Sequence, residues 1–209
     1  MVGAMKISQG VGTTAPVAGF LLGFLDFVWI KYVPFPFGGL GNSIAVWAVA
    51  AFLLTFHSRW SLPRATVGAV VFLVVAVPSY YVAAALIQND DWANIYAPYS
   101  LLWMLLGVVA GAVFGAGGGI ARTPSRRRIP ALALPAAVLL AEAVLQLFRL
   151  GDPGVVLSET LGYVGVLVAA AVGVTLVVAP AWRVRAQVLA CAVPLTAAGG
   201  VLLFASGFR

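Results

Sequence analysis

Residues 19–33, GFLLGFLDFVWIKYV, decide the fold class of this chain. The run is apolar enough to form a membrane-spanning helix, but Asp26 stands inside it between Leu25 and Phe27. A charged side chain at the centre of a bilayer costs about 2.5–3.5 kcal/mol by insertion scales. An acid at this position therefore needs either a partner or a function.

The composition of the whole chain agrees with a membrane protein. Hydrophobic residues make up 63% of the 209 residues and charged residues only 9%, against about 25% charged residues in soluble domains. The net charge of +6 does not predict nucleic-acid binding, because the basic residues fall in short gaps between apolar runs. The expected partner is the lipid bilayer. A single cysteine, Cys191, excludes an internal disulfide.

Seven apolar segments are candidate spans, since about 20 residues cross a ~30 Å hydrocarbon core. They cover residues 15–33, 43–57, 65–88, 98–121, 129–150, 157–179 and 187–206. The second is short, and we expect it to extend at one end. No connector is long enough for a soluble domain, and we find no internal repeat. The sequence predicts one all-α domain, residues 1–209, built as a polytopic membrane bundle of seven transmembrane helices.

Basic residues predict the orientation of the bundle. Under the seven-span arrangement, nine of the twelve fall at one face: Lys6, Arg59, Arg64, Arg122, Arg126, Arg127, Arg128, Arg183 and Arg185. The positive-inside rule makes that face cytoplasmic. We therefore expect the N-terminus inside and the C-terminus outside, with Lys31, Arg149 and Arg209 as exceptions.

Acidic residues gather toward the opposite face. Asp90, Asp91 and Asp152 lie in outer connectors, and Glu159 opens the sixth span. Asp26 and Glu142 lie inside spans, each past the midpoint on the outer side. Polar and aromatic residues at similar depth are Trp29, Asn42, Trp47, Tyr80, Tyr81, Trp103, Gln146, Arg149 and Tyr163. Because polar groups in lipid must be enclosed by protein, the pattern predicts an aromatic-lined cavity with two buried carboxyls, open toward the outer leaflet.

Several of these residues also have a structural interpretation. Asp26 could pair with Lys31 or Arg149, and the tyrosines and tryptophans could form an interfacial belt. Asn42 and Ser43 could cap the second helix. The acidic stretch NDDWAN, residues 89–94, has the composition of a metal-binding motif, but two aspartates in a short loop are more often solvated. We therefore expect no metal and no cofactor.

Glycines form two patterns that indicate helix packing. Gly19 and Gly23 are a small-xxx-small pair, which lets a neighbouring backbone approach closely. The second pattern recurs every four residues in the fourth span, at Gly107, Gly111, Gly115 and Gly119. Four-residue spacing places glycines on one helix face, so we interpret both patterns as packing devices rather than phosphate cradles.

Four blocks of sequence carry a resemblance to a known family: GNSIAVWAVAAFLL (41–54), SYYVAAALI (79–87), GAVFGAGGGIAR (111–122) and LLAEAVLQLF (139–148). In this order they resemble a family of small multi-pass membrane proteins from actinobacteria, over residues 19–180. Most of that family has no known activity. The chain is also similar to the integral membrane terpene cyclases of drimentine-type indole sesquiterpenoid pathways. The resemblance implies a protein of the bacterial cytoplasmic membrane.

The resemblance further implies cyclisation of a farnesyl chain on an indole-derived diketopiperazine, started by protonation of an alkene. Such chemistry needs an undissociated acid in a dry pocket, and desolvation raises the pKa of a carboxyl. Asp26 is the first candidate for the proton donor. Glu142 is the second, or a partner that orients or reprotonates Asp26. Aromatic faces such as Tyr80, Tyr81 and Trp103 could stabilise the carbocation. Trp29 could do the same.

Two other classes of function compete with the cyclase. A small-molecule-binding subunit of a membrane transporter would also have a pocket open to the outer leaflet, although we find no docking motif for a partner ATPase. A structural subunit of a larger complex would keep its buried acids as ion pairs. The sequence leaves the oligomeric state open.

Overall fold

The computed structural model describes residues 10–205, with side chains as far as Val201. Its elements in chain order are α1 (Val11–Tyr32), η1 (Phe37–Asn42), α2 (Ile44–Ser58), α3 (Leu62–Gln88), η2 (Trp92–Tyr96), α4 (Pro98–Ala121), α5 (Arg128–Phe148), α6 (Leu157–Val178) and α7 (Trp182–Ala205). All regular structure in these residues is helical, which confirms the all-α class. Lys6 and Arg209 lie outside the described residues.

Six of the helices, α1 and α3 to α7, are long and apolar enough to cross a membrane. Their ranges follow six of the expected spans closely, and they support an integral membrane protein. The remaining helix, α2, has 15 residues and is about 22 Å long. That length falls short of a ~30 Å hydrocarbon core, so the expected count of seven spans is not confirmed.

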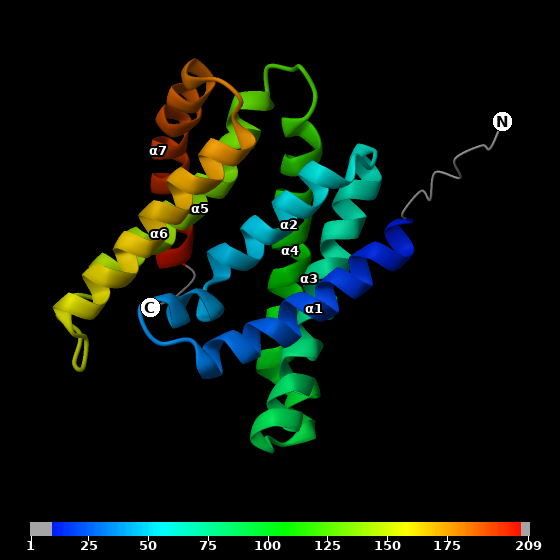
Figure 1. Ribbon diagram of the computed structural model, residues 1–209, viewed down its shortest axis with the longest axis vertical. Helices are drawn as coiled ribbons and strands as arrows, with labels where there is room; N and C mark the ends of the chain where they lie inside the picture. The colour runs from blue at the N-terminus through cyan, green and yellow to red at the C-terminus, as the bar shows by residue number, and fades with distance from the viewer. Residues whose placement is uncertain (1–9, 206–209) are drawn as a thin grey trace.

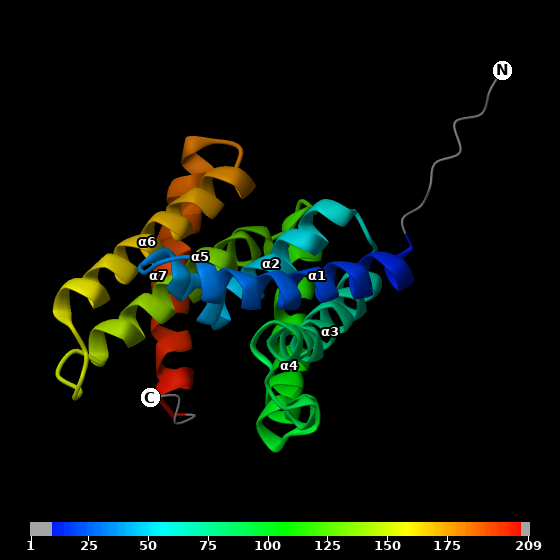
Figure 2. The same cartoon turned by 60° about the horizontal axis from the view of Figure 1, so that its bottom comes forward.

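The helices form two groups, which Figures 1 and 2 show from two directions. In the first group α1 and α4 pack on either side of α3, and in the second α6 and α7 pack on α5. Helix α2 lies between the groups and contacts α3, α4 and α5. In Figure 1 the connectors after α2, α4 and α6 lie toward the top, and those after α3 and α5 lie toward the bottom.

Glycines bring α1 against α3 at backbone distance. A Cβ atom added to Gly19 would lie 2.3 Å from the carbonyl oxygen of Phe72, and one added to Gly23 would lie 1.9 Å from that of Ala76. The hydroxyl of Ser79 on α3 donates to the carbonyl of Phe20 on α1 at 2.6 Å. The predicted small-xxx-small contact is confirmed, and it fixes which face of α1 turns inward.

The glycine pattern of α4 has the same use. A Cβ atom on Gly111 would lie 2.6 Å from the Cα atom of Val70, and one on Gly115 would lie 2.5 Å from the Cβ atom of Ala69. Both neighbours belong to α3, so the interpretation of this pattern as a packing device is confirmed. Helices α1, α3 and α4 are therefore held together mainly by close backbone contact.

Candidate functional site

A cavity of about 210 Å³ lies between the three helices of the first group, α1, α3 and α4, and the N-terminal half of α2. Its lining residues are Asp26, Gly41, Asn42, Ser43, Ile44, Trp47, Ala48, Leu73, Val77, Tyr80, Tyr81, Trp103, Leu106, Gly107 and Ala110. Of these, Asn42 and Ile44 are exposed and mark the opening. Asp26 is the one carboxyl in this lining, and the other groups are mostly aliphatic or aromatic.

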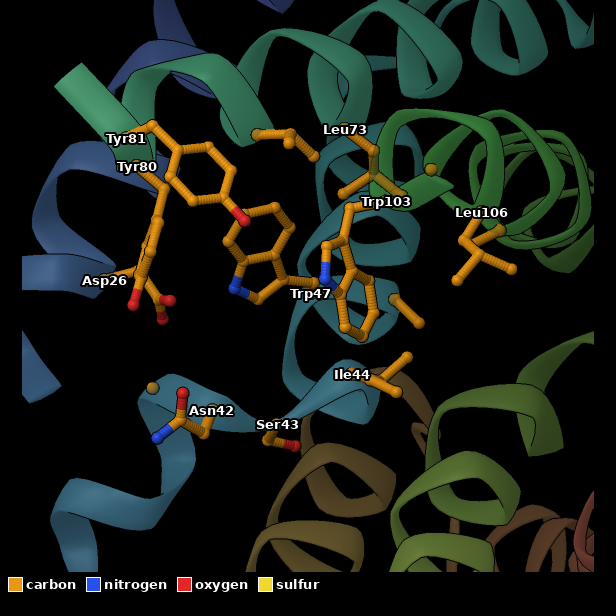
Figure 3. A pocket seen from close by; sticks show the side chains of 15 residues that line it. Asp26, Asn42, Ser43, Ile44, Trp47, Leu73, Tyr80, Tyr81, Trp103 and Leu106 are labelled. Carbon is orange, nitrogen blue, oxygen red and sulfur yellow. The ribbon is translucent and has the colours of Figure 1, made fainter. Parts of the chain in front are cut away.

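Helix α1 directs Asp26 into the cavity because Gly19, Gly23 and Asp26 share one helix face. The glycines press that face onto α3, and the Asp26 side chain is left only 9% exposed. The indole N–H of Trp47, on α2, is its hydrogen-bond partner. Figure 3 shows the carboxyl beside the Tyr80 hydroxyl and above the amide of Asn42.

Aromatic rings form the wall of the cavity above Asp26. Tyr80 and Tyr81 meet edge to face with ring centroids 5.4 Å apart, and Phe27 packs on the Tyr80 ring at 5.3 Å. Tyr81 in turn meets Tyr99 of α4 at 5.8 Å. These contacts connect the wall to three helices, so the two tyrosines of α3 are packed against neighbouring aromatic rings.

The cations proposed as partners of Asp26 are not paired with it. The ammonium group of Lys31 donates to the carbonyl of Ile87 at 3.3 Å. Within the described side chains, residues 10–201, Asp26 forms no ion pair with Lys31 or with Arg149. The acid of the opening sequence therefore faces the cavity without a compensating positive charge.

Glu142, the second predicted acid, lies outside the cavity and caps α2. One of its oxygens, Oε2, accepts hydrogen bonds from the Ser43 hydroxyl at 2.9 Å and from the Ala45 N–H at 3.0 Å. The other, Oε1, accepts from the Tyr163 hydroxyl at 2.7 Å. Ser43 itself accepts from the Val46 N–H at 3.1 Å, which confirms it as a helix cap. The first N–H groups of a helix have no partner within it, and here α5 supplies one.

The structure brings five of the nine predicted binding residues together at the cavity: Asn42, Trp47, Tyr80, Tyr81 and Trp103. The other four lie elsewhere. The Trp29 side chain is 43% exposed, and its indole N–H donates to the Phe37 carbonyl at 2.9 Å. Tyr163 is bound to Glu142, and Gln146 and Arg149 lie at the end of α5.

A second, shallower hollow lies on the outer side of α1. It is lined by Ala18, Leu21, Leu22, Leu25, Asp26, Trp29 and Phe72. Leu21, Leu25 and Trp29 are exposed, as expected for a helix face that meets lipid. Asp26 borders both this hollow and the cavity. Asp26 is thus shared by the interior cavity and the exposed side of α1.

Sequence reasoning missed the small and aliphatic part of the lining. Leu73, Val77 and Tyr80 are spaced at i, i+4 and i+7, so they lie on one face of α3. The same rule connects Trp103 with Leu106, Gly107 and Ala110 on α4. Helical spacing from the aromatic residues could have found these positions. Nothing in the sequence indicates the 3₁₀ turn η1, which brings Gly41 and Asn42 to the cavity.

The acidic loop before η2 has a local structural role. The Asp91 carboxylate accepts a hydrogen bond from the Ala93 N–H at 2.9 Å, which caps η2. Within the described part of the chain, no group of three His, Cys, Asp or Glu side chains is arranged to hold a metal ion.

Taken together, the helices and the site define a polytopic, all-helical membrane protein with an internal aromatic cavity that is lined by one carboxyl without a cationic partner. The chain belongs to a family of unknown function (DUF6518), whose sequence profile matches residues 7–207. No curated protein and no solved structure shows a significant match to it.

Proposed function

We propose that the protein is an integral membrane terpene cyclase, with Asp26 as the acid that starts the reaction. The substrate is a farnesyl chain attached to an indole-derived diketopiperazine. One observation carries the proposal: a carboxyl without a cationic partner lies at an apolar, aromatic-lined cavity inside a membrane protein. An intramembrane acid is a functional candidate by default because its burial is costly.

The reaction is an isomerisation. The π electrons of an alkene take the proton of Asp26, which leaves a carbocation on the chain and a carboxylate on Asp26. A second alkene attacks the cation and closes a ring. The last cation then gives up a proton and forms an alkene, and this proton returns to the Asp26 carboxylate, directly or through solvent at the opening, which restores the acid. The product has the mass of the substrate, and no diphosphate leaves, so no metal is required.

The cavity walls suit these steps. The faces of Trp47, Tyr80 and Tyr81 attract a nearby cation by cation–π interaction, worth about 0.5–2 kcal/mol each. Aliphatic residues of α3 and α4 exclude the water that would quench the cation. The Trp47 indole N–H is placed to hold the Asp26 carboxylate once its proton has left.

The size of the cavity indicates how the substrate binds. Pockets for drug-sized ligands measure about 300–1,000 Å³, so a cavity of about 210 Å³ holds only part of such a molecule. We place the reacting end of the prenyl chain inside and the polar diketopiperazine at the opening, near Asn42 and Ile44. Glu142 acts as a positioning residue, because it caps the helix that presents Trp47.

The decisive experiment incubates the purified protein with a farnesylated indole diketopiperazine and searches for a cyclic isomer by chromatography and mass spectrometry. We expect conversion by the wild type and by Asp90→Asn, a matched change in an outer loop. Asp26→Glu should retain part of the activity, because the proton remains but is displaced by one methylene. If the substrate binds and is recovered unchanged, the transport-subunit alternative gains and the cyclase proposal fails.

We also propose the bacterial cytoplasmic membrane as the location, with the N-terminus inside and the C-terminus outside. Eight arginines lie in the connectors after α2, α4 and α6 or in the first turns of the helices that follow them, and the positive-inside rule makes that end cytoplasmic. The proposal requires α2 and η1 together to complete a seventh crossing. A reporter that is active only in the cytoplasm, fused after Arg209, should then be silent. Strong reporter activity there would contradict the orientation.

A further inference from the structure

Positive charge accumulates at one end of the bundle without any carboxylate to balance it. The arginines of that end are Arg59, Arg64, Arg122, Arg126, Arg127, Arg128, Arg183 and Arg185, in or next to the connectors after α2, α4 and α6. All six acidic residues of the chain lie in the second halves of α1 and α5, at the start of α6, or in the connectors after α3 and α5. The neutralising groups of this end must therefore come from outside the chain.

Two of its connectors, α2–α3 and α4–α5, are joined by Arg122. One of its guanidinium nitrogens, Nη2, donates to the carbonyl of Trp60. Arg59 is close enough to matter electrostatically: burial lowers the pKa of the Arg122 guanidinium, and the positive charge of Arg59 lowers it further. Two positive charges this close destabilise each other. An anion bound between Arg59 and Arg122 would therefore stabilise both.

Two buried donors without an acceptor lie at the ends of the α4–α5 connector, on Arg122 and on Arg128, the first residue of α5. The Nε–H groups of Arg122 and Arg128 are inaccessible to solvent and have no hydrogen-bond partner among the described residues. A buried donor without a partner is costly, and more so when it belongs to a charged group. A phosphate bound side-on would satisfy each Nε–H once the arginine side chain turns outward, since the planar guanidinium fork matches two phosphate oxygens.

We infer that the α2–α3 and α4–α5 connectors form a binding site for the phosphate headgroup of an anionic membrane lipid, with Arg59, Arg122 and Arg128 as its donors. A lipid fits better than a free phosphate because each connector adjoins at least one helix long enough to span a membrane, which places the connectors at the bilayer surface. Basic pockets between helices at that depth are typical sites for anionic headgroups. This site is at the opposite end of the bundle from the opening of the cavity and does not depend on the proposed cyclase activity.

The test uses the full-length protein in nanodiscs of phosphatidylcholine, with increasing fractions of phosphatidylglycerol. The readouts are lipid retained in native mass spectrometry and the midpoint of thermal unfolding. We expect phosphatidylglycerol to be retained and to raise the midpoint. Arg128→Gln and Arg122→Gln should each weaken retention by about tenfold, the effect of losing one charge-assisted hydrogen bond. Arg183→Gln is the matched control, since it removes one positive charge at the same end of the bundle but outside the proposed site. Arg183 lies over the Trp182 ring.

Each outcome decides the proposal. Selective loss of retention in the Arg122 and Arg128 variants, with the Arg183 variant unchanged, supports the site. An equal loss in all three variants indicates only general attraction to negative charge and overturns it. Stabilisation by inorganic phosphate alone, in phosphatidylcholine nanodiscs, would show that the arginines bind a soluble anion and would contradict the proposed lipid site. If Arg122→Gln does not fold because its bond to Trp60 is lost, Arg59→Gln replaces it in the same comparison.

Discussion

The buried carboxyl of Asp26 and the partly buried carboxyl of Glu142 have opposite surroundings, although both lie in the second half of a helix long enough to span a membrane. Glu142 accepts three hydrogen bonds, from Ser43, Ala45 and Tyr163, which fill both of its oxygens. Asp26 faces a cavity of about 210 Å³, with Trp47 as its partner. An acid whose oxygens both accept hydrogen bonds from the protein has a structural role. A buried acid that faces empty space remains available to a ligand.

The helices around the two acids differ in a corresponding way. Helix α1 reaches α3 through Gly19 and Gly23, so the face that carries Asp26 has small residues at these two contact points. Helix α5 has an inner face of alanines and leucines, including Leu132 and Leu139, which pack tightly against α6 and α7. Dense packing around Glu142 and open space at Asp26 are thus properties of the two helix groups, and single substitutions can test the contrast.

The largest effect is expected from Asp26→Asn. Asparagine keeps the shape of the side chain but has no acidic proton to give. General acid catalysis is typically worth about 10²–10⁴-fold, and here it starts the reaction, so cyclisation should fall by at least that factor. The thermal unfolding midpoint should change little, since no ion pair is lost. A monodisperse variant with near-normal turnover would contradict the assignment of Asp26.

Glu142→Ala should mainly lower stability, whereas Asp26→Asn should mainly lower activity. It leaves the Ala45 N–H and the Ser43 hydroxyl without their acceptor, whereas Tyr163 retains the Gly39 carbonyl at 3.0 Å. At about 1–3 kcal/mol for each buried orphan group, we expect a loss of about 2–4 kcal/mol in the free energy of unfolding. Denaturation with SDS in mixed micelles measures it. Glu142→Gln, which keeps one acceptor oxygen, should lose less; equal losses would argue against the capping role.

Gly23→Ala tests whether the contact of α1 with α3 requires glycine. The added Cβ atom would lie 1.9 Å from the Ala76 carbonyl oxygen, so α1 must move. Overpacking costs about 1–3 kcal/mol, more than the ~1 kcal/mol that alanine gains in helix propensity. The control is Gly165→Ala in α6, where the added atom meets nothing within 4 Å. Opposite signs of the two stability changes are expected, and matching signs would count against a close contact at Gly23.

The smallest effect is expected from Ser79→Ala, which removes the hydrogen bond to the Phe20 carbonyl. Hydrogen bonds between membrane helices average about 0.6 kcal/mol by double-mutant cycles, so the unfolding free energy should fall by roughly that amount. The same SDS titration applies. A loss as large as that of Gly23→Ala would show that hydrogen bonding, rather than backbone proximity, holds α1 on α3.

Much of the architecture could be predicted from the sequence because lipid imposes simple rules. Long apolar runs must form helices in a bilayer, since their backbone groups have no water to bind. Six of the predicted spans are therefore long helices at nearly the predicted positions. Glycines at four-residue spacing must share a helix face, which predicted that Gly23 and Gly111 pack against a neighbouring helix; that this helix is α3 in both cases comes from the structure.

The sequence by itself determined the class of the fold, the location of Asp26 and Glu142 in the second half of their helices, and four of the aromatic residues that line the cavity. It could not separate Asp26 from Glu142, because depth along a helix says nothing about what faces the side chain across the bundle. Only the tertiary structure decided that, through the short helix α2. Its first turn begins inside the protein, so its unpaired N–H groups needed an acceptor, and Glu142 was placed to supply it. Asp26 lies near the same end of α2, but there Trp47 and Asn42 line the cavity.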